Sequence, residues 1–192
     1  MTIYFTSDSH FRHKKIVEFE QRPFESTEEM NEGLIKAWNN TVKSGDLVYH
    51  LGDFCFGSYN EWINIIERLN GEIVLIKGNH DSSDIIKKAH KNGYLNEVHM
   101  IGYYMKSNGY ILNLTHYPME IGNRPRNFNI SGHIHAQPSR MLNQVNVGVD
   151  SPLNFNRPFG QPISQDELIA HLDYINPKVE EQFHIERGIT IW

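Results

Sequence analysis

Leu47-Val48-Tyr49-His50-Leu51-Gly52-Asp53 is an apolar, aromatic and β-branched run that stops at a glycine followed by a carboxylate. It predicts a buried strand that ends in a tight turn. The same arrangement recurs at residues 3–8, Ile-Tyr-Phe-Thr-Ser-Asp, and at residues 73–79, Ile-Val-Leu-Ile-Lys-Gly-Asn. Because open α/β sheets collect ligands beyond the carboxyl ends of their strands, these three polar ends predict one shared site.

Strands alternate with helices along most of the chain. Helices are predicted from a cap at Ser26 through Trp38, and over residues 59–69, 84–91 and 164–171. A hairpin is predicted from strands over 97–105 and 110–115 around Ser107-Asn108-Gly109, followed by strands over 130–132 and 145–149. This alternation indicates the α/β class, and the length of 192 residues indicates a single domain, 1–192.

Composition narrows the classes of function. The formal net charge is -5, so the chain has no basic surface for broad nucleic-acid binding. A single cysteine, Cys55, excludes an internal disulfide framework and is typical of a reducing compartment. No apolar run approaches 18 residues, and the sequence enters a strand at once. We therefore expect a soluble, cytoplasmic protein with no membrane partner.

Five short runs, in a fixed order, hold residues that bind divalent metals or move protons. They are Asp8-Ser9-His10, Gly52-Asp53, Gly78-Asn79-His80-Asp81, His116 and Gly132-His133-Ile134-His135. Each run alone is common, and Gly52-Asp53 in isolation is more often a simple turn. Asp8 and His10 lie two apart on backbone that we expect to be extended, as do His133 and His135, so each pair should share a face. The mixed carboxylate, imidazole and amide set suits Mn, Fe, Zn, Co or Ni better than Ca or Mg.

The ordered set resembles the calcineurin-like metallophosphoesterase superfamily. The stretches Phe5–His13, Arg22-Pro23-Phe24 and Val48–Phe54 resemble its short bacterial and phage-type members. The resemblance implies two mixed β-sheets packed face to face with flanking helices, a four-layer αββα sandwich. It also implies two divalent metal ions, with manganese expected and iron, zinc, nickel or cobalt as alternatives. The implied ligands are Asp8, His10 and His135 for the first ion, Asn79, His116 and His133 for the second, and Asp53 as a bridge.

The same resemblance implies the reaction. A hydroxide that bridges the metals would attack the phosphorus of a phosphodiester or phosphomonoester. His80 would assist the leaving group as a general acid, and Asp81 would orient the His80 ring. The expected partner is a small phosphoester, with a nucleotide as one candidate, and the expected assembly is a monomer or a small homo-oligomer.

Other residues have weaker predicted roles. Arg12 and His13 follow the first motif and are predicted to contact phosphate, with a plain surface position as the alternative. Asn79 is predicted to reach substrate as well as metal. A loop before the last motif carries Asn123, Arg124 and Arg126, and the two arginines are predicted to bind an anionic substrate. His50 is expected to be a buried support, and Cys55 an unreactive packed residue.

Two further functions remain open. One is a nuclease of the DNA-repair type with the same motifs, although the short, acidic chain argues against it. The other is a scaffold on the same fold without catalysis, although no motif residue is missing. The residues after Gly52-Asp53 lack the Asp-Arg-Gly extension of protein serine/threonine phosphatases, which argues against a phosphoprotein substrate. The stretch 152–160 is longer than expected before the last helix and either shapes the pocket or is an inert loop.

Overall fold

Three strands of the first sheet are those that the opening sequence pattern predicted. In the computed structural model, which describes residues 1–189, its five strands lie in the order β4-β3-β2-β1-β9. Residues 190–192 of the predicted domain lie outside the described residues. The first four strands of the chain run parallel, and β9 pairs antiparallel with β1. The bounds are β1 (Ile3–Thr6), β2 (Leu47–His50), β3 (Glu72–Ile76), β4 (Glu97–His99) and β9 (Ile163–Ser164).

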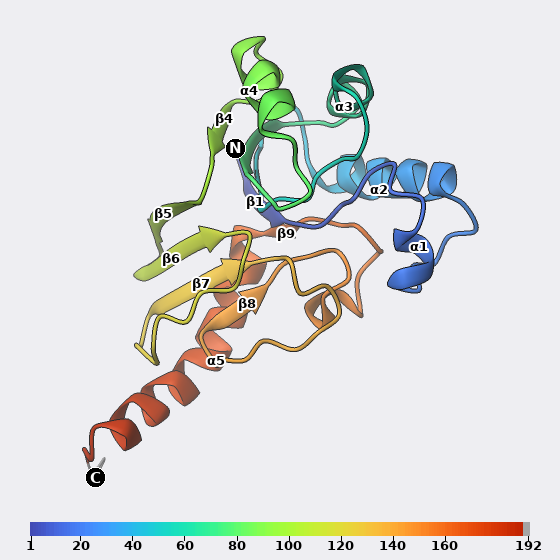
Figure 1. Ribbon diagram of the computed structural model, residues 1–192. Coiled ribbons are helices and arrows are strands. Elements are labelled where there is room, and N and C mark those ends of the chain that lie inside the picture. The colour runs from blue at the N-terminus through green and yellow to red at the C-terminus, as the bar shows by residue number, and fades with distance from the viewer. Residues whose placement is uncertain (190–192) are drawn as a thin grey trace.

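The second sheet has four strands in the order β5-β6-β7-β8. The β5–β6 pair is antiparallel, whereas β6, β7 and β8 are parallel to one another. The bounds are β5 (Gly102–Ser107), β6 (Tyr110–Thr115), β7 (Asn127–Ser131) and β8 (Gln144–Asn146). Both sheets are therefore mixed, and the predicted α/β class with two mixed sheets and flanking helices is confirmed (Figure 1).

The helices surround the sheets. Figure 1 shows α2, α3 and α4 beside the five-stranded sheet and α5 behind the four-stranded sheet. The predicted cap is present, because the Ser26 side chain accepts a hydrogen bond from the backbone N–H of Glu29 at 3.1 Å. The bounds are α1 (Ile16–Phe19), α2 (Thr27–Thr41), α3 (Tyr59–Ile66), α4 (Ser83–Lys91), the 3-10 helix η1 (Pro152–Asn154) and α5 (Gln165–Glu186). Within residues 1–189, none of the helices combines the length and the apolar character that a membrane crossing needs.

Two buried clusters follow from the alternation of side chains along the strands. Val48 packs with the helices in one cluster, and its neighbour Tyr49 packs in the other cluster with strands of the second sheet. The Tyr49 ring stacks on Tyr103 of β5 with 5.5 Å between ring centres. The first sheet is thus covered on both faces, which explains its nearly continuous apolar strands.

The largest differences from the predicted boundaries concern two elements. The stretch 97–105 was predicted as one strand, but β4 pairs with β3 in the first sheet and β5 pairs with β6 in the second. The chain changes sheets at Met100 and Ile101, whose side chains are exposed, so periodicity along the sequence carries no sign of the switch. The last helix continues well beyond residue 171, because its apolar face extends to the fully buried Val179.

The polar ends of the strands meet at one place. The loops after β1, β2 and β3 and those after β6 and β7 leave the carboxyl ends of parallel strands, where the five motifs lie. The two sheets are joined there by a bridge between Ser7 and Gly148, with the Val149 N–H donating to the Ser7 carbonyl at 3.1 Å. The fold therefore brings both halves of the motif set to one edge.

The buried cluster shared by the two sheets leads to a prediction about the stability lost when a cavity is made in it. Leu112 is fully buried in this cluster, so Leu112→Ala should lower the free energy of unfolding by about 2–5 kcal/mol. Urea denaturation in the presence of a chelator measures this loss. Ile101→Ala is the control, because Ile101 is 86% exposed and its truncation should change stability by about 0.5 kcal/mol or less. Equal effects of the two variants would contradict the assignment of the core.

Candidate metal centre

Six of the predicted ligands form two compact groups of donor atoms. The first group is Asp8, His10 and His135, and the second group is Asp53, His116 and His133. Within each group the donor atoms lie within 4.8 Å of one another. The seventh predicted ligand, Asn79, lies beside the second group, with its Oδ1 atom 2.8 Å from Nε2 of His116. The structure thus brings all seven residues together.

Asp53 lies between the two groups. Its Oδ2 atom is 3.6 Å from Nε2 of His10 in the first group and 3.4 Å from Nε2 of His116 in the second. Each group also draws on both sheets, because Asp8, His10 and Asp53 follow strands of the first sheet and the other three histidines follow strands of the second. The centre therefore exists only where the sheets meet.

The backbone at these residues differs from the sequence expectation. Asp8, His10, Asp53, His133 and His135 have φ angles between 47° and 70°, in the left-handed region. The prediction of extended backbone at the pair Asp8 and His10 and at the pair His133 and His135 is therefore wrong. Asp8 and His10 do share a group, but His133 and His135 turn into different groups. Left-handed conformations are unfavourable for non-glycine residues and concentrate at functional sites, which is the pattern here.

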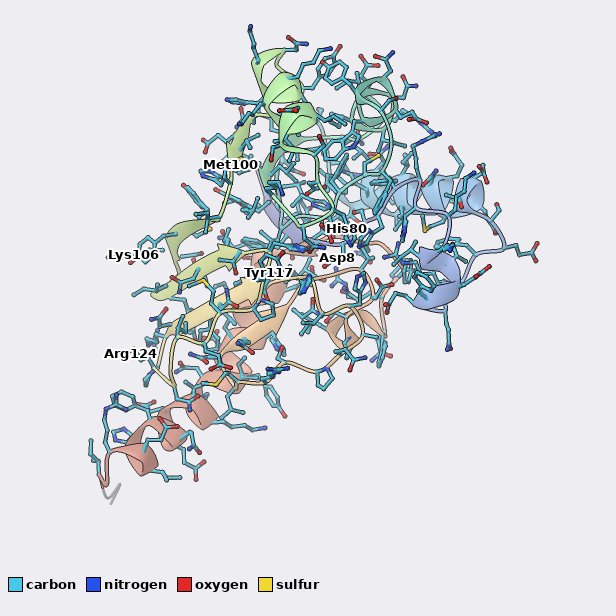
Figure 2. The ribbon with its side chains drawn as sticks, in the orientation of Figure 1. Asp8, His80, Met100, Lys106, Tyr117 and Arg124 are labelled. Atoms are coloured by element: carbon cyan, nitrogen blue, oxygen red, sulfur yellow. The ribbon has the colours of Figure 1, made fainter. Side chains whose placement is uncertain are left out.

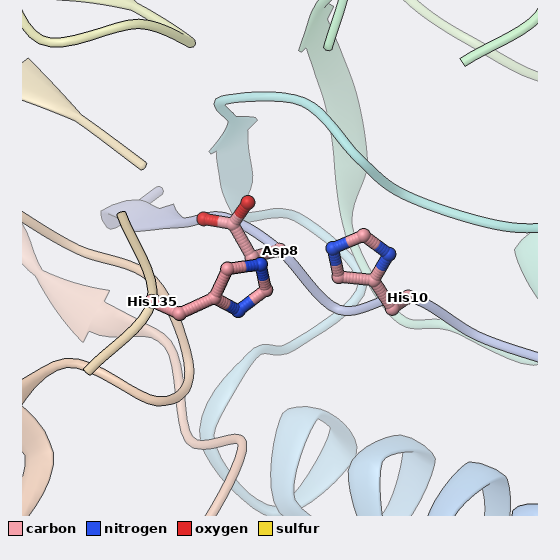
Figure 3. A group of neighbouring side chains, drawn as sticks. All are labelled: Asp8, His10 and His135. Carbon is pink, nitrogen blue, oxygen red and sulfur yellow. The ribbon is translucent and has the colours of Figure 1, made fainter. Parts of the chain in front are cut away.

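The donor atoms fit a bound cation. Oδ1 of Asp8 and both ring nitrogens of His10 are buried without a hydrogen-bond partner. Buried polar atoms without partners are costly and rare, and an ion among them would satisfy them. Figure 3 shows one ring nitrogen of His135 turned toward Asp8 and the other turned away. The mixed nitrogen and oxygen set fits the first-row transition ions better than calcium or magnesium.

The electrostatics of the centre favour the metal-binding form at some donors and protonation at others. Burial lowers the pKa of His10 to about 2, so its ring is neutral. Burial also acts to raise the pKa of Asp53, but the hydrogen bond and charge of His116 outweigh it, and this pKa falls to about 2. Burial raises the pKa of Asp8 to about 6. Burial acts to lower the pKa of His116, but its hydrogen bond with Asp53 outweighs burial and raises this pKa. Metals bind neutral imidazoles and ionised carboxylates, so a cation at the second group would meet an ionised Asp53 and would compete with protonation of His116.

Asp81 has a different task from the predicted one. Its carboxylate accepts hydrogen bonds from the backbone N–H groups of Asp53 (2.8 Å), Phe54 (2.8 Å) and Gly78 (2.9 Å). The prediction that Asp81 orients the His80 ring is therefore wrong. The Asp81 side chain is buried beneath the loops, whereas the preceding residue, His80, is exposed. Asp81 instead fixes the loop that carries Asp53 against the loop that carries Asn79.

His80 lies at the exposed side of the centre. Its backbone N–H donates to Oδ1 of Asp53 at 2.8 Å, and its ring packs 5.6 Å from His10 and 5.3 Å from Phe56. His13 stacks on the same Phe56 ring at 4.2 Å. Arg12 is also on the surface, but its guanidinium is paired with Glu61 at 2.5 Å.

The arginines of the loop before β7 are not brought to the centre. The Arg126 guanidinium lies over the Tyr110 ring at 5.4 Å, and its backbone N–H donates to the Asn176 side chain on α5 at 2.7 Å. Arg124 lies far from Asp8 and His80 (Figure 2). Both arginines precede β7, whereas His133 and His135 follow it. This corrects their predicted contact with substrate at the metals.

Sequence reasoning missed two residues of the centre. Asp150 accepts a hydrogen bond from Nδ1 of His135 at 2.8 Å and is paired with the buried guanidinium of Arg22 at 2.7 Å. Asp150 follows the predicted strand 145–149 in the same way that Asp8 and Asp53 follow theirs, so a signal was present. Arg22 was named only as part of the segment Arg22-Pro23-Phe24 that resembles the family, and no role was predicted for it. The predicted support role of His50 is borne out, because Ser9 Oγ lies 2.9 Å from its Nε2 atom.

Glycines permit the close approach of the loops. A Cβ atom on Gly132 would overlap Oγ of Ser7 and Oδ2 of Asp8. Gly52 has a φ of +99°, and a Cβ atom there would lie 2.6 Å from Nδ1 of His116. The tight turn predicted at Gly52 is therefore confirmed, and both glycines let the loops approach closely.

Comparisons with known proteins agree with this geometry. The family model described as calcineurin-like phosphoesterase matches residues 1–186. An uncharacterized protein of Methanocaldococcus jannaschii, MJ1445, is 45% identical over 95 residues, which are 48% of this chain and 54% of that protein. The gene 66 protein of Mycobacterium phage L5 is 36% identical over 92 residues, which are 46% of this chain and 44% of that protein. The matches thus span about half the length of these curated relatives.

A solved structure covers more of the chain. The crystal structure of the Aquifex aeolicus protein AQ665, a protein of unknown function, superposes with a TM-score of 0.68 at 25% sequence identity. The match covers 88% of this chain and 98% of that protein. The two-sheet architecture described above is therefore shared along nearly the whole of that structure.

The packing around Gly132 predicts a sharp steric effect. Gly132→Ala should displace Ser7 and Asp8, cost about 1–3 kcal/mol of stability through overpacking, and weaken metal binding at the first group. Unfolding in chelator measures the first effect, and calorimetric titration with Mn²⁺ measures the second. Gly45→Ala is the matched control, because a Cβ atom there meets nothing within 4 Å. If Gly132→Ala and Gly45→Ala gave the same stability and the same Mn²⁺ affinity, the close packing around Gly132 would be contradicted.

Proposed function

This chain belongs to the calcineurin-like phosphoesterase family, and from that premise we propose that it is a dinuclear metal-dependent hydrolase of phosphoric esters. The observation that carries the proposal is the pair of donor groups with Asp53 between them. A single metal site would need only one of these groups. Two groups that share a carboxylate support a centre for two adjacent ions.

The proposed ligands follow the donor groups. The first ion is bound by Asp8, His10 and His135, the second by Asn79, His116 and His133, and Asp53 contacts both. Manganese is the expected metal, and iron, zinc, nickel or cobalt have compatible ligand preferences. A pair of such ions supplies an activated water as the nucleophile and neutralises charge on the phosphoryl oxygens.

The chain's own residues complete the proposed reaction. His80 lies at the exposed side of the centre, where its ring can give a proton to the departing oxygen. His13 stacks on Phe56 beside it and is available to contact the phosphate. Arg12 could do so only by leaving its ion pair with Glu61. Asn79 is exposed next to the second group and can contact both an ion and a substrate oxygen.

The proposed substrate is a small phosphodiester or phosphomonoester, with a nucleotide as a candidate. The net charge of -5 argues against a long nucleic acid held by its backbone. The proposed reaction needs no second macromolecule, because both donor groups and His80 come from one chain. A monomer or a small homo-oligomer is therefore sufficient.

An activity panel tests the proposal. Chelation should abolish hydrolysis of bis-p-nitrophenyl phosphate, p-nitrophenyl phosphate and 2′,3′- and 3′,5′-cyclic nucleotides, and Mn²⁺ should restore it on at least one of them. Bound metal is measured on the same sample by elemental analysis. A folded, metal-loaded protein that cleaves none of these substrates would favour the silent scaffold. Cleavage confined to DNA would favour the nuclease.

The position of His80 predicts a loss that depends on the leaving group. His80→Ala should keep both ions, because the link from residue 80 to Asp53 is a backbone N–H. It should lower kcat by about 10²–10⁴-fold on a nucleotide diester, whose alkoxide needs a proton. The loss on bis-p-nitrophenyl phosphate should be much smaller, because p-nitrophenolate leaves without one.

His90→Ala is the matched control for this prediction, since His90 is exposed on α4. It should leave both rates and the metal content unchanged. Equal losses on both substrates in His80→Ala would point to substrate positioning by His80. Loss of an ion in that variant would instead make His80 a ligand.

A further inference from the structure

Arg22 is a buried arginine whose donors are all used. Its Nε atom donates to Oδ1 of Asp150 at 2.9 Å, and Nη2 donates to Oδ2 of the same carboxylate at 2.7 Å. Nη1 donates to the Ser9 carbonyl at 2.8 Å and to Sδ of Met30 at 3.3 Å. Nη2 also donates to the Asp8 carbonyl at 2.7 Å. These partners account for the five N–H groups of a guanidinium.

These contacts join Asp150 to the two segments that carry the first group. The Asp8 and Ser9 carbonyls belong to the loop whose left-handed backbone presents Asp8 and His10. Asp150 accepts from Nδ1 of His135 at 2.8 Å, and as an arginine-paired carboxylate it can only accept. Nδ1 of His135 therefore carries the hydrogen, which leaves Nε2 free to bind a metal. Figure 3 shows a ring nitrogen of His135 turned toward Asp8.

We infer that Arg22 and Asp150 are positioning residues that assemble the first metal site and leave the second largely unaffected. The inference rests on the ligand assignment of the proposed function. Arg22 fixes the loop that presents Asp8 and His10, and Asp150 fixes the tautomer and the orientation of His135. One guanidinium thus sets all three ligands of the first group.

The second group has supports of its own. His116 donates its Nδ1 hydrogen to the Leu51 carbonyl at 2.8 Å. The loops that present Asp53 and Asn79 are tied together by the Asp81 carboxylate. Within residues 1–189, the hydrogen bonds of Arg22 and Asp150 reach none of Asp53, Asn79, His116 or His133. The expected effect of changing Arg22 or Asp150 is therefore asymmetric.

A purely structural ion pair is the competing explanation. Breaking a buried pair leaves an uncompensated charge and destabilises the whole domain. Such a loss would weaken both metal sites together, or neither once the protein is folded. The two explanations therefore differ in how the loss of affinity divides between two sites, which activity alone cannot reveal.

The experiment compares Asp150→Asn, Arg22→Lys and wild type. The 192-residue chain is stripped of metal and titrated with Mn²⁺ by calorimetry. Asp150→Asn keeps the shape of the side chain but removes the charge, and Arg22→Lys loses the fork that joins Asp150 to the Asp8–Ser9 carbonyls. In both variants the Kd of one site should rise about 10–100-fold. The Kd of the other site should change by no more than about threefold from the wild-type value, which is much less than the rise expected at the affected site. Thermal unfolding in chelator identifies any variant that does not fold, and Asp150→Asn then carries the test.

Electron paramagnetic resonance identifies the affected site. At a Mn²⁺ concentration that fills both wild-type sites, wild type should give the spectrum of a coupled pair, and Asp150→Asn the six-line spectrum of an isolated ion. His133→Ala, which removes a ligand of the second group, should also give an isolated ion, and adding Asp150→Asn to it should abolish tight binding. Arg68→Lys is the matched control, because its pair with Glu32 is exposed and remote.

Each outcome bears on a separate claim. Two tightly bound, coupled ions in Asp150→Asn would overturn the inference, and so would equal loss from both sites. A wild-type protein that binds fewer than two ions would instead overturn the ligand assignment of the proposed function. Filling of the weakened site at high Mn²⁺ in Asp150→Asn, with the coupled spectrum recovered, would support the inference.

Discussion

The contact between the carboxyl edges of the two sheets is the constraint on which the site depends. Ser7, at the end of β1, pairs with Gly148, and the His133 N–H donates to the Asp8 carboxylate at 2.9 Å. Each donor group takes residues from both sheets. The apolar cluster between the sheets therefore supplies more than stability. It sets the distance between two halves of a centre that neither sheet contains alone.

That arrangement is held against an opposing cost. Asp8, His10 and Asp53 are almost fully buried, and five of the ligands have left-handed backbone. Burial of polar atoms and strain of this kind are each unfavourable. Three kinds of contact oppose them: the Arg22 clamp on the Asp8–Ser9 carbonyls, the Asp81 carboxylate, and the glycines that let the loops touch. A cation would satisfy the remaining unpaired atoms, so the centre is preorganised for a ligand that it can hold tightly.

The open side of the centre has a different character. His80 and Asn79 are exposed, and a stack of His13, Phe56 and His80 forms the rim. Rigid, buried ligands beneath exposed, aromatic and ionisable side chains separate metal binding from contact with the substrate. In the proposed function, the deep residues would hold the ions and the rim would contact the phosphoester.

Sequence alone determined the parts of this protein that are local. Strand ends such as Leu51-Gly52-Asp53, the Ser26 cap and the Asn108-Gly109 turn are set by neighbouring residues, as the structure bears out. The ordered motifs, through their resemblance to a known family, predicted the seven residues that gather at the centre. The carboxyl ends of parallel strands bring them to a common edge. What only the tertiary structure decided depends on how the sheets meet. Arg22 and Asp150 are 128 residues apart, Asp81 turns away from His80 to the loop amides, and Arg124 and Arg126 lie at the other end of β7. These contacts arise between segments distant in sequence, so no spacing or periodicity along the chain encodes them.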